Sequence, residues 1–382
     1  LFMGLIMLIG VITMYSLSPQ RAAFLNKSYG GNYDSMHFFW RQIMSLGLGL
    51  VAFVAMSRVP ISWIYRHSGK ILVIGFVICA ILAVLGFAKI PPAKCELGAC
   101  RWFKFGSVSV QPSEFLKVGV LIALAVFLGS KAREGKINDF RETILPSGLL
   151  VGLMLVFIAG FQKDLGTAIS ALAIVAFQFF MAGLSRRNIT IASLIAVAAI
   201  VGLILIAPHR MARVMTFAGN ENCSNLSSSE QKDEYHICHA KIAIGSGGIF
   251  GVGIGNSVQA TGYLPEAIND SVFAILGETF GFIGLVIILA IFLALAMRIL
   301  RVAAYLKNPA SRILAAGVCG WFVFHTVMNV TAMTGLLPLT GITMPLLSYG
   351  GTSILFISGV LGLIFNISAY TSFRQVDDFK EE

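Results

Sequence analysis

Charged side chains are scarce in this sequence: only 12% of its 382 residues are Asp, Glu, Lys or Arg, whereas 57% are hydrophobic. Soluble domains carry about 25% charged residues, so the composition excludes a soluble protein and leaves little room for a soluble domain. The sequence also lacks a nucleic-acid-binding motif and an internal repeat visible by eye. No inverted pair of Gly/Pro-broken helices is present either, which disfavours the common transporter architectures.

Long apolar runs take the place of the missing charge. A run of roughly 17–25 apolar residues is long enough to span a bilayer as a helix. Three polar residues alone separate the fifth run from the sixth, so nine spans are an alternative to ten. The sequence therefore predicts an all-α polytopic integral membrane protein with about ten transmembrane helices. The ten runs are 1–17, 39–57, 70–90, 112–130, 146–162, 166–183, 189–207, 271–297, 312–334 and 349–368.

One connection, residues 208–270, is far longer than the others. Its middle is polar and its second half is glycine-rich, which suggests a lid with a structured base beside the membrane. We expect the whole chain, 1–382, to form a single membrane domain. Residue 1 is a Leu inside an apolar run with no basic flank, so we expect a truncated first transmembrane helix and not a signal peptide.

Basic residues indicate the orientation in the membrane, because short basic loops stay in the cytoplasm. Every second connection is short and basic, which predicts cytoplasmic termini and outer loops at 91–111, 208–270 and 335–348. The net charge of +10 indicates contact with a membrane surface and an anionic ligand. The basic residues of the alternate connections are Arg58, Arg66 and Lys70; Lys131, Arg133, Lys136 and Arg141; Arg186 and Arg187; Arg298, Arg301, Lys307 and Arg312; and Arg374 and Lys380.

Four of the six cysteines, Cys95, Cys100, Cys223 and Cys238, lie in the predicted outer loops. An oxidising exterior permits disulfides. The simplest pairing joins the sequence-local partners, Cys95 with Cys100 and Cys223 with Cys238, although four cysteines allow three pairings.

Two acids, Glu266 and Asp270, stand where the long loop meets the eighth apolar run. Acidic side chains at the edge of a bilayer are costly, which makes them functional candidates. Asp270 has a simpler alternative: it precedes a helix directly, and Asp is a favoured N-cap residue.

Other charged residues stand at the mouths of predicted helices. Glu114 and Lys117 are three residues apart on one helical face, so they can form an ion pair that neutralises itself. Arg101-Trp102 lies in the outer loop before them. Asp164 lies between two helices and is well placed to cap the second.

Two segments carry many backbone-shaping residues. The glycine-rich stretch 245–255 matches neither a dinucleotide-binding nor a Walker pattern, which favours close helix packing or the approach of backbone to a ligand. The stretch 336–353 is broken by proline and glycine and includes Ser348. Irregular backbone at membrane depth must be buried in protein or line a cavity.

These motifs together resemble the SEDS family (shape, elongation, division, sporulation), whose members include FtsW, RodA and SpoVE. The resemblance covers essentially the whole chain, and residues 255–267 look more like FtsW. There are departures: Ile268-Asn269 replaces a usual His-Thr, and Lys163 stands in place of Pro. The motifs, in order, are Arg101-Trp102, Gln111-Pro112-Ser113-Glu114, 164–167, 243–248, 263–267 and 348–351.

The resemblance implies a peptidoglycan glycosyltransferase in the bacterial cytoplasmic membrane with its site on the outer face. It would polymerise lipid II, release polyprenyl diphosphate, and work with a class B penicillin-binding protein and other division or elongation proteins. The family's essential acid falls on Asp270, the expected base. We expect the remaining site residues to bind substrate: Arg101, Trp102, Glu114, Lys117, Asp164, Arg210, Arg213, Glu266 and Ser348.

No metal ligands are predicted, although a divalent cation, Mg²⁺ or Mn²⁺, could assist the diphosphate. Two alternatives come from other functional classes. A lipid II flippase needs a cavity but no base, and a non-catalytic scaffold needs only a surface that recruits the penicillin-binding protein.

Overall fold

The computed structural model describes residues 1–96, 99–106, 108–205, 211, 214–215 and 232–371. Within this part of the chain, ten helices are long and apolar enough to cross a membrane, so the predicted polytopic all-α class is confirmed. The spans are α1 (Phe2–Tyr29), α2 (His37–Arg58), α4 (Ser68–Ala88), α5 (Pro112–Arg133), the composite span Phe140–Phe161, α7 (Leu165–Ala182), α8 (Arg186–Leu205), α11 (Val272–Tyr305), α12 (Pro309–Met333) and α13 (Gly351–Ser368).

Shorter elements connect these spans. The composite span consists of η1 (Phe140–Ile144), α6 (Leu145–Leu155) and η2 (Val156–Phe161), with π-helical turns on both sides of α6. It is separate from α7, which confirms ten spans over nine. The remaining short elements are α3 (Ile61–Arg66), α10 (Lys232–Ser246) and η3 (Gln259–Thr261).

The first span is longer than its apolar run predicts. Helix α1 continues through Pro19 to Tyr29 and includes the polar pair Gln20 and Arg21. These side chains find partners in the protein: the Gln20 amide donates to the carbonyl of Gly255 at 3.2 Å, and Arg21 approaches Glu266. Because the Gly255 carbonyl and the Glu266 carboxylate satisfy these polar side chains, α1 can continue beyond its apolar part.

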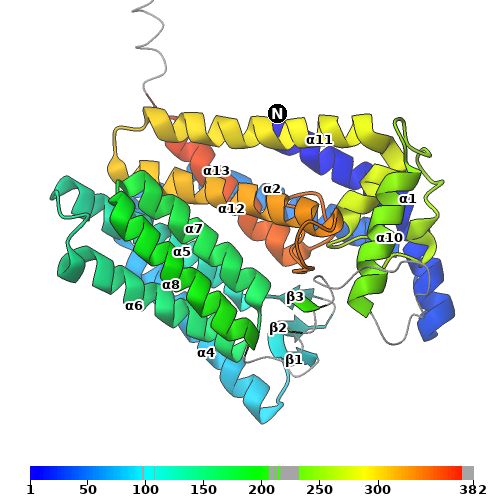
Figure 1. Cartoon of the computed structure of the whole chain (residues 1–382), viewed down its shortest axis with the longest axis horizontal. Helices are drawn as coiled ribbons and strands as arrows, with labels where there is room; N and C mark the ends of the chain where they lie inside the picture. Colours follow the sequence, from blue (N-terminus) through cyan, green and yellow to red (C-terminus); the bar gives the residue numbers. More distant parts are fainter. Residues whose placement is uncertain (97–98, 107, 206–210, 212–213, 216–231, 372–382) are drawn as a thin grey trace, which may run out of the picture. The chain divides into compact units, whose positions relative to one another are not determined.

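The outer loop 91–111 contains a small sheet that the sequence did not predict. Its three antiparallel strands are β1 (Ala93–Glu96), β2 (Ala99–Phe105) and β3 (Val108–Val110), in the order β1-β2-β3. β1 and β2 contact α4, and β2 also contacts α5 (Figure 1). Cys95 and Cys100 lie opposite each other in the β1–β2 ladder, and they form a disulfide. That predicted pair is confirmed.

The chain forms two compact units. The first consists of 1–47, 201–295 and 323–354, and the second of 48–200, 296–322 and 355–382. That the whole chain is one membrane domain stays a prediction.

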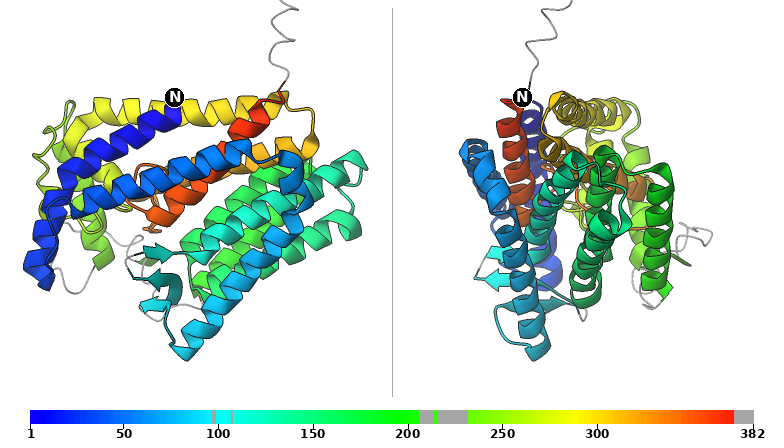
Figure 2. Two further views of the ribbon diagram at one scale, coloured as in Figure 1. Left: turned by 180° about the vertical axis from the view of Figure 1, so that it is seen from behind. Right: turned by 90° about the vertical axis from the view of Figure 1, so that its left-hand side faces the viewer.

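In the second unit, α5 packs against α4 and α7 (Figure 2). Glycines let α4 and α5 approach closely, since a Cβ on Gly75 or Gly119 would lie 3.2 Å from a backbone atom of the facing helix. The buried Gln178 of α7 donates to the carbonyl of Leu121 in α5 at 2.7 Å. Small residues and interhelical hydrogen bonds are typical of helix contacts in membranes.

The first unit brings segments that are distant in sequence onto one region. η3 and its neighbouring turns contact α1, and the Phe24 ring lies against Gly262. The connection between α12 and α13 packs on α1 too, with Leu347 next to Gly10. Tyr349 donates its backbone N–H to the carbonyl of Ile268 at 2.8 Å. Residues 259–271 are thus fixed from two sides.

Within the first unit, α11 is broken and a glycine-rich segment repairs the break. Gly281 has non-helical backbone angles, φ 66° and ψ −168°. Residues 247–253 lie against the break and exchange four backbone hydrogen bonds with it, which satisfies the groups that the missing turn leaves free. The bonds are Phe282 N–H to Gly248 O, 2.9 Å; Ile283 N–H to Ile249 O, 3.2 Å; Val252 N–H to Glu278 O, 2.9 Å; and Gly253 N–H to Thr279 O, 3.0 Å.

This contact gives a reason for glycines in the stretch 245–255. From the sequence we predicted close helix packing or the approach of backbone to a ligand there. A Cβ on Gly251, whose φ is +81°, would overlap with the carbonyl of Thr279. A Cβ on Gly247 would likewise overlap with the carbonyl of Gly277. The close approach is therefore made to the protein's own helix backbone.

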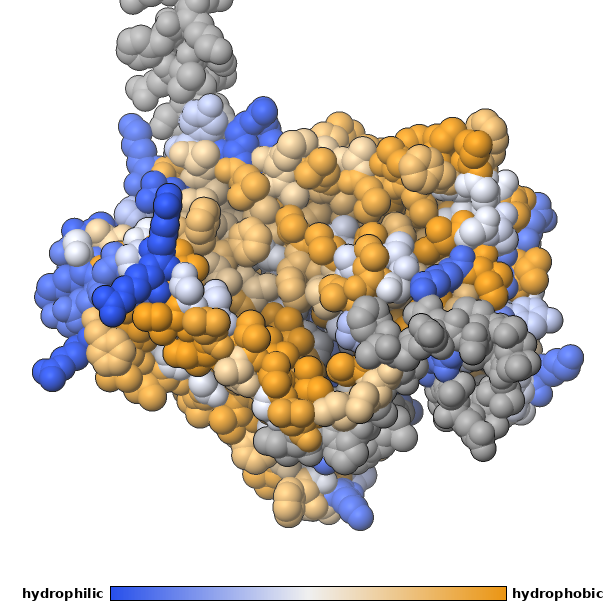
Figure 3. Space-filling view, viewed as in Figure 1, coloured by the Kyte–Doolittle hydropathy of each residue, from blue (hydrophilic) through white to orange (hydrophobic). Residues whose placement is uncertain are grey.

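Apolar side chains cover the outer surfaces of the spanning helices. The most apolar window of α8 has none of its residues buried inside the protein. In the view of Figure 3, apolar side chains cover much of the protein surface. Such surfaces need lipid around them, as expected for a membrane protein.

Candidate active site

Asp270 lies at the end of the turns that connect η3 with α11, and it is partly exposed. Helix α11 begins at Val272. Ser271, not Asp270, therefore stands directly before the helix, and its carbonyl accepts the N–H groups of Ala274 and Ile275. The position of Asp270 one residue earlier weakens the N-cap alternative.

Asn329 of α12 holds the main chain of Asp270. Its side-chain amide donates to the carbonyl of Asp270 at 2.6 Å and to that of Ile342 at 2.7 Å. Asn329 is fully buried. One side chain thus ties the loop before α11 to the loop after α12, which fixes the position of the Asp270 main chain.

His236 of α10 supports the next residue. The Ser271 hydroxyl donates to the carbonyl of Pro265 at 2.8 Å, so it accepts from His236 Nε2 at 2.5 Å. A hydroxyl has one proton to donate, and therefore the proton of that contact is on Nε2. His236 and Asn329 were not predicted from the sequence, because nothing in their local pattern distinguishes them from packing residues.

The Asp270 carboxylate faces the Pro/Gly-broken connection between α12 and α13. A Cβ on Gly341, whose φ is +71°, would lie 3.8 Å from Asp270 Oδ2. A side chain at position 341 would therefore contact the Asp270 carboxylate.

Glu266 lies in the same turns and is about half exposed. Its φ of +48° is unusual for a residue other than glycine. The Asn269 amide donates to Glu266 Oε2, and Arg21 Nη2 lies 3.8 Å from Oε1. These contacts give Glu266 a role in shaping the turn before Asp270.

Ser348 braces the connection between α12 and α13. Its hydroxyl accepts the N–H of Met344 at 2.9 Å, and its carbonyl accepts the Gln42 amide at 3.5 Å. The residue is buried. These bonds explain why a serine stands there, and substrate binding by Ser348 stays a prediction.

The second unit holds the predicted pair Glu114 and Lys117. Lys117 Nζ lies 2.8 Å from Glu114 Oε1, and both residues are buried. Lys117 also lies over the Trp321 ring, 4.4 Å from its centre, and donates to the Ser170 hydroxyl at 3.4 Å. The ion pair predicted from the i, i+3 spacing is confirmed.

Asp164 caps α7, as its position predicted. Its carboxylate accepts the backbone N–H of Thr167 at 3.0 Å and the Thr167 hydroxyl at 2.9 Å. Gln111, the residue before α5, donates its side-chain amide to Asp164 Oδ2 at 3.0 Å. Asp164 therefore joins the starts of α5 and α7.

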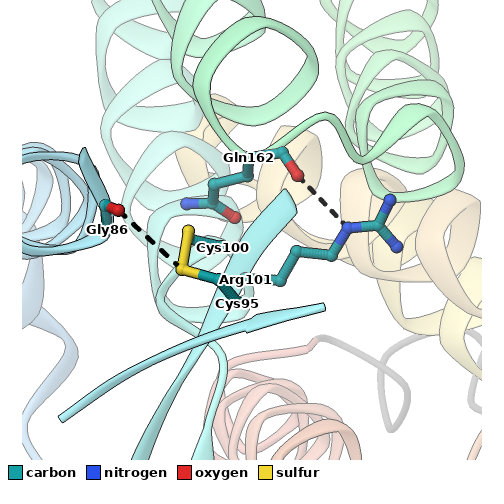
Figure 4. Close-up of a disulfide and its surroundings, with 5 residues drawn as sticks. All are labelled: Gly86, Cys95, Cys100, Arg101 and Gln162. Carbon is teal, nitrogen blue, oxygen red and sulfur yellow. Dashed lines mark hydrogen bonds between the residues drawn. A yellow bond between two sulfur atoms is a disulfide. The ribbon is translucent and has the colours of Figure 1, made fainter. Parts of the chain in front are cut away.

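Arg101 of β2 clamps the turn before Asp164. It donates from Nε to the carbonyl of Gln162 at 3.2 Å and from Nη2 to that of Lys163 at 2.8 Å. Figure 4 shows Arg101 beside the Cys95–Cys100 disulfide, reaching towards Gln162. Successive side chains of a strand point to opposite faces, so Arg101 and Trp102 do not line one face of the sheet.

Two predicted site residues, Arg210 and Arg213, lie outside the described residues, and so does Cys223. Cys238, the predicted partner of Cys223, is disulfide-bonded. Within the described ranges, no three His, Cys, Asp or Glu side chains are grouped so that they could hold a metal ion.

Ten spanning helices and a fixed, partly exposed acid at the start of one of them define a multi-pass membrane protein with a candidate catalytic carboxylate. Comparison with known proteins specifies the family. The family model FtsW/RodA/SpoVE, described as "Cell cycle protein", matches residues 1–373. This chain belongs to that family, and it is a multi-pass bacterial membrane protein.

Similar proteins cover nearly the whole chain. Stage V sporulation protein E of Bacillus subtilis is 33% identical over 371 residues, which are 97% of this chain and 95% of that protein. A "Probable peptidoglycan glycosyltransferase FtsW" of Coxiella burnetii is 32% identical over 340 residues, 88% of this chain and 87% of that protein.

Solved structures share the fold. RodA of Thermus thermophilus has a TM-score of 0.68 at 22% identity, covering 97% of this chain and 95% of that chain. A chain from a peptidoglycan synthase complex has a TM-score of 0.69 at 23% identity, covering 95% and 96%.

Proposed function

We propose that this protein is a peptidoglycan glycosyltransferase that polymerises lipid II, with Asp270 as its base. The observation that carries the assignment of the base is the setting of Asp270. Its main chain is held by Asn329, its neighbour Ser271 is held by His236, and its side chain is partly exposed. A base needs a fixed position and access to its substrate.

The proposed reaction joins two sugars. The 4-hydroxyl of an acceptor GlcNAc attacks C1 of a donor MurNAc, and its proton passes to the Asp270 carboxylate. The bond between C1 and the diphosphate oxygen breaks, and polyprenyl diphosphate leaves with the electron pair. Negative charge near C1 also stabilises the oxocarbenium-like transition state. Protonated Asp270 must then lose its proton before the next turnover.

The departing diphosphate needs cations. Arg101 and Lys117 each have protein partners, so we assign them to positioning: Arg101 holds the turn before Asp164, and Lys117 holds the start of α5. Trp102 would shape the groove for the sugar or the lipid. Arg210 and Arg213, which the sequence predicted to bind substrate, are our proposed ligands of the diphosphate. A divalent cation, Mg²⁺ or Mn²⁺, that assists the diphosphate stays a proposal, and no step is assigned to it.

The orientation and the partner are also proposals. The alternating basic loops support cytoplasmic termini and an outer position for residues 259–271. A chain of the same fold comes from a peptidoglycan synthase complex, which supports a class B penicillin-binding protein as partner. Such a partner would cross-link the strands that this protein makes.

The test is glycan polymerisation from purified lipid II by the wild type, Asp270→Asn and Asp270→Ala, each co-purified with its penicillin-binding protein. A general base contributes about 10²–10⁴-fold, so we expect Asp270→Asn to lose at least about 100-fold in rate. Its binding of the partner and its unfolding temperature should match the wild type. Arg101→Ala should lower polymerisation less severely, and normal activity would remove its positioning role.

Other outcomes would favour the alternatives. If Asp270→Asn polymerises as well as the wild type, Asp270 is not the base, and Glu266 is the next acid to test. A wild type that moves lipid II across vesicles but makes no glycan would favour a flippase. A wild type that does neither, while still binding the penicillin-binding protein, would favour a scaffold.

A further inference from the structure

The glycine-rich segment 247–253 lies at a measurable depth along α11. Residues 279–297 carry no charged side chain, and a helix needs about 20 residues to cross the hydrocarbon core. The core therefore begins near Glu278. Gly248 and Ile249 bond to the N–H groups of Phe282 and Ile283. These levels lie four and five residues beyond Glu278, and therefore inside the core boundary.

The side chains at this level are apolar and exposed to the surroundings of the protein. Ile249 is 61% exposed and Phe250 is 80% exposed, and Phe282 beside them on α11 is 67% exposed. Exposed apolar groups of this size in a loop favour burial in something other than water. Ile254 and Val258, a few residues further along the chain, are also exposed.

The backbone at this level is compatible with lipid. Irregular backbone is tolerated at membrane depth only where its polar groups are satisfied within the protein. The bonds to the break in α11 satisfy the carbonyls of Gly248 and Ile249 and the N–H groups of Val252 and Gly253, and the N–H of Gly251 donates to the carbonyl of Gly247 at 2.7 Å. Glu278, a buried acid at the boundary, accepts the Ser257 hydroxyl at 2.5 Å, the N–H of Val258 at 2.9 Å and that of Gln259 at 3.3 Å. Its charge is thus compensated by the turn that follows the glycine-rich segment.

We propose that residues 247–254 form a re-entrant segment that inserts into the bilayer, with Ile249 and Phe250 in contact with lipid acyl chains. The segment would be anchored to α11 within the bilayer. The sequence instead predicts that it is part of the outer loop 208–270. Insertion by about 5–10 Å is typical of interfacial apolar elements. In the proposed orientation the leaflet is the outer one, and the insertion itself does not depend on catalysis.

The test is the collision accessibility of nitroxide labels. Single variants Ile249→Cys and Phe250→Cys would be labelled and reconstituted in vesicles of phosphatidylethanolamine and phosphatidylglycerol. Thr261→Cys is the water-exposed control, and Val197→Cys on α8 is the lipid-exposed control, since both positions are exposed. Cys79 and Cys319 are buried, and unsubstituted protein gives the labelling background.

Oxygen partitions into acyl chains, whereas a neutral nickel chelate stays in water. We expect the oxygen-to-nickel ratio at 249 and 250 to match that at 197 and to exceed that at 261 by about threefold or more. Ratios at 249 and 250 equal to that at 261 would overturn the proposal. Labels that neither reagent reaches would overturn it too, because they would show a protein contact. Neither result depends on polymerase activity, so the proposed function is tested separately.

Discussion

Asp270 and Glu114 are both acids at the start of a membrane-spanning helix, one in each compact unit, and they differ in burial and in the contacts that fix them. Glu114 is held by its side chain, which is buried against Lys117. Asp270 is held by its main chain through Asn329, while its side chain is partly exposed. An acid bound in an internal ion pair cannot readily accept a substrate proton. The buried pair suits Glu114 to holding its helix, whereas its partly exposed side chain suits Asp270 to contact with a substrate.

The largest effect on stability should come from breaking the buried pair. Lys117→Met leaves Glu114 buried without its cation, and Glu114 Oε2 has no other partner among the described residues. Removing one partner of a buried ion pair costs about 3–5 kcal/mol. Unfolding in detergent would measure this loss. The double variant Glu114→Gln/Lys117→Met should recover most of it, and a fully stable Lys117→Met would contradict the comparison.

Glu278 offers a third way of holding an acid, by a loop. In Glu278→Gln, one of the two carboxylate oxygens becomes an amide that faces the donors of Ser257, Val258 and Gln259. Because hydrogen bonds to a charged acceptor contribute about 1.5–3 kcal/mol, we expect a loss of about 3 kcal/mol in unfolding free energy. The control Glu134→Gln removes an exposed ion pair and should change stability by about 0.5 kcal/mol. Equal effects would show that Glu278 does not anchor the loop.

Asn329→Ala would separate activity from stability. The change leaves two carbonyls without their donor and should cost about 2–3 kcal/mol. Asn366 is a matched control in the other unit, because its amide also donates to two carbonyls, those of Val59 at 2.6 Å and Met56 at 3.3 Å. Both alanine variants should lose similar stability, whereas only Asn329→Ala should lose about tenfold in polymerisation at matched folded fraction. Equal activity in the two would show that holding the Asp270 main chain is not needed.

The smallest effect should come from the disulfide beside Arg101. Cys95 and Cys100 close a loop with a sequence separation of only 5, and short loops gain least from cross-linking, about 2 kcal/mol. The double variant Cys95→Ser/Cys100→Ser should lose no more than this and should keep most of its polymerisation rate. A large loss of activity would instead show that the sheet fixes the position of Arg101.

Several features followed from local sequence alone. Apolar runs predicted the spanning helices because a bilayer requires about 20 apolar residues per helix. The i, i+3 spacing predicted the Glu114–Lys117 pair, and the position of Asp164 predicted its cap on α7. The Cys95–Cys100 pair is local as well. Each of these needs only neighbours along the chain.

Other features depended on contacts between segments far apart in sequence. The small sheet, the break at Gly281 and the glycine-rich segment that repairs it have no local signal of comparable strength. The setting of Asp270 is similar: its support comes from His236 and Asn329, on helices before and after it.

The sequence by itself determined the membrane class, a count of nine or ten spans, and the acid to which the family resemblance points. It did so because hydropathy and helical spacing act over a few turns. Only the tertiary structure decided which acids lie in ion pairs, caps or loops, and that Asp270 combines a fixed main chain with a partly exposed side chain. That distinction rests on hydrogen bonds between residues up to about 60 positions apart, and no local pattern contains it.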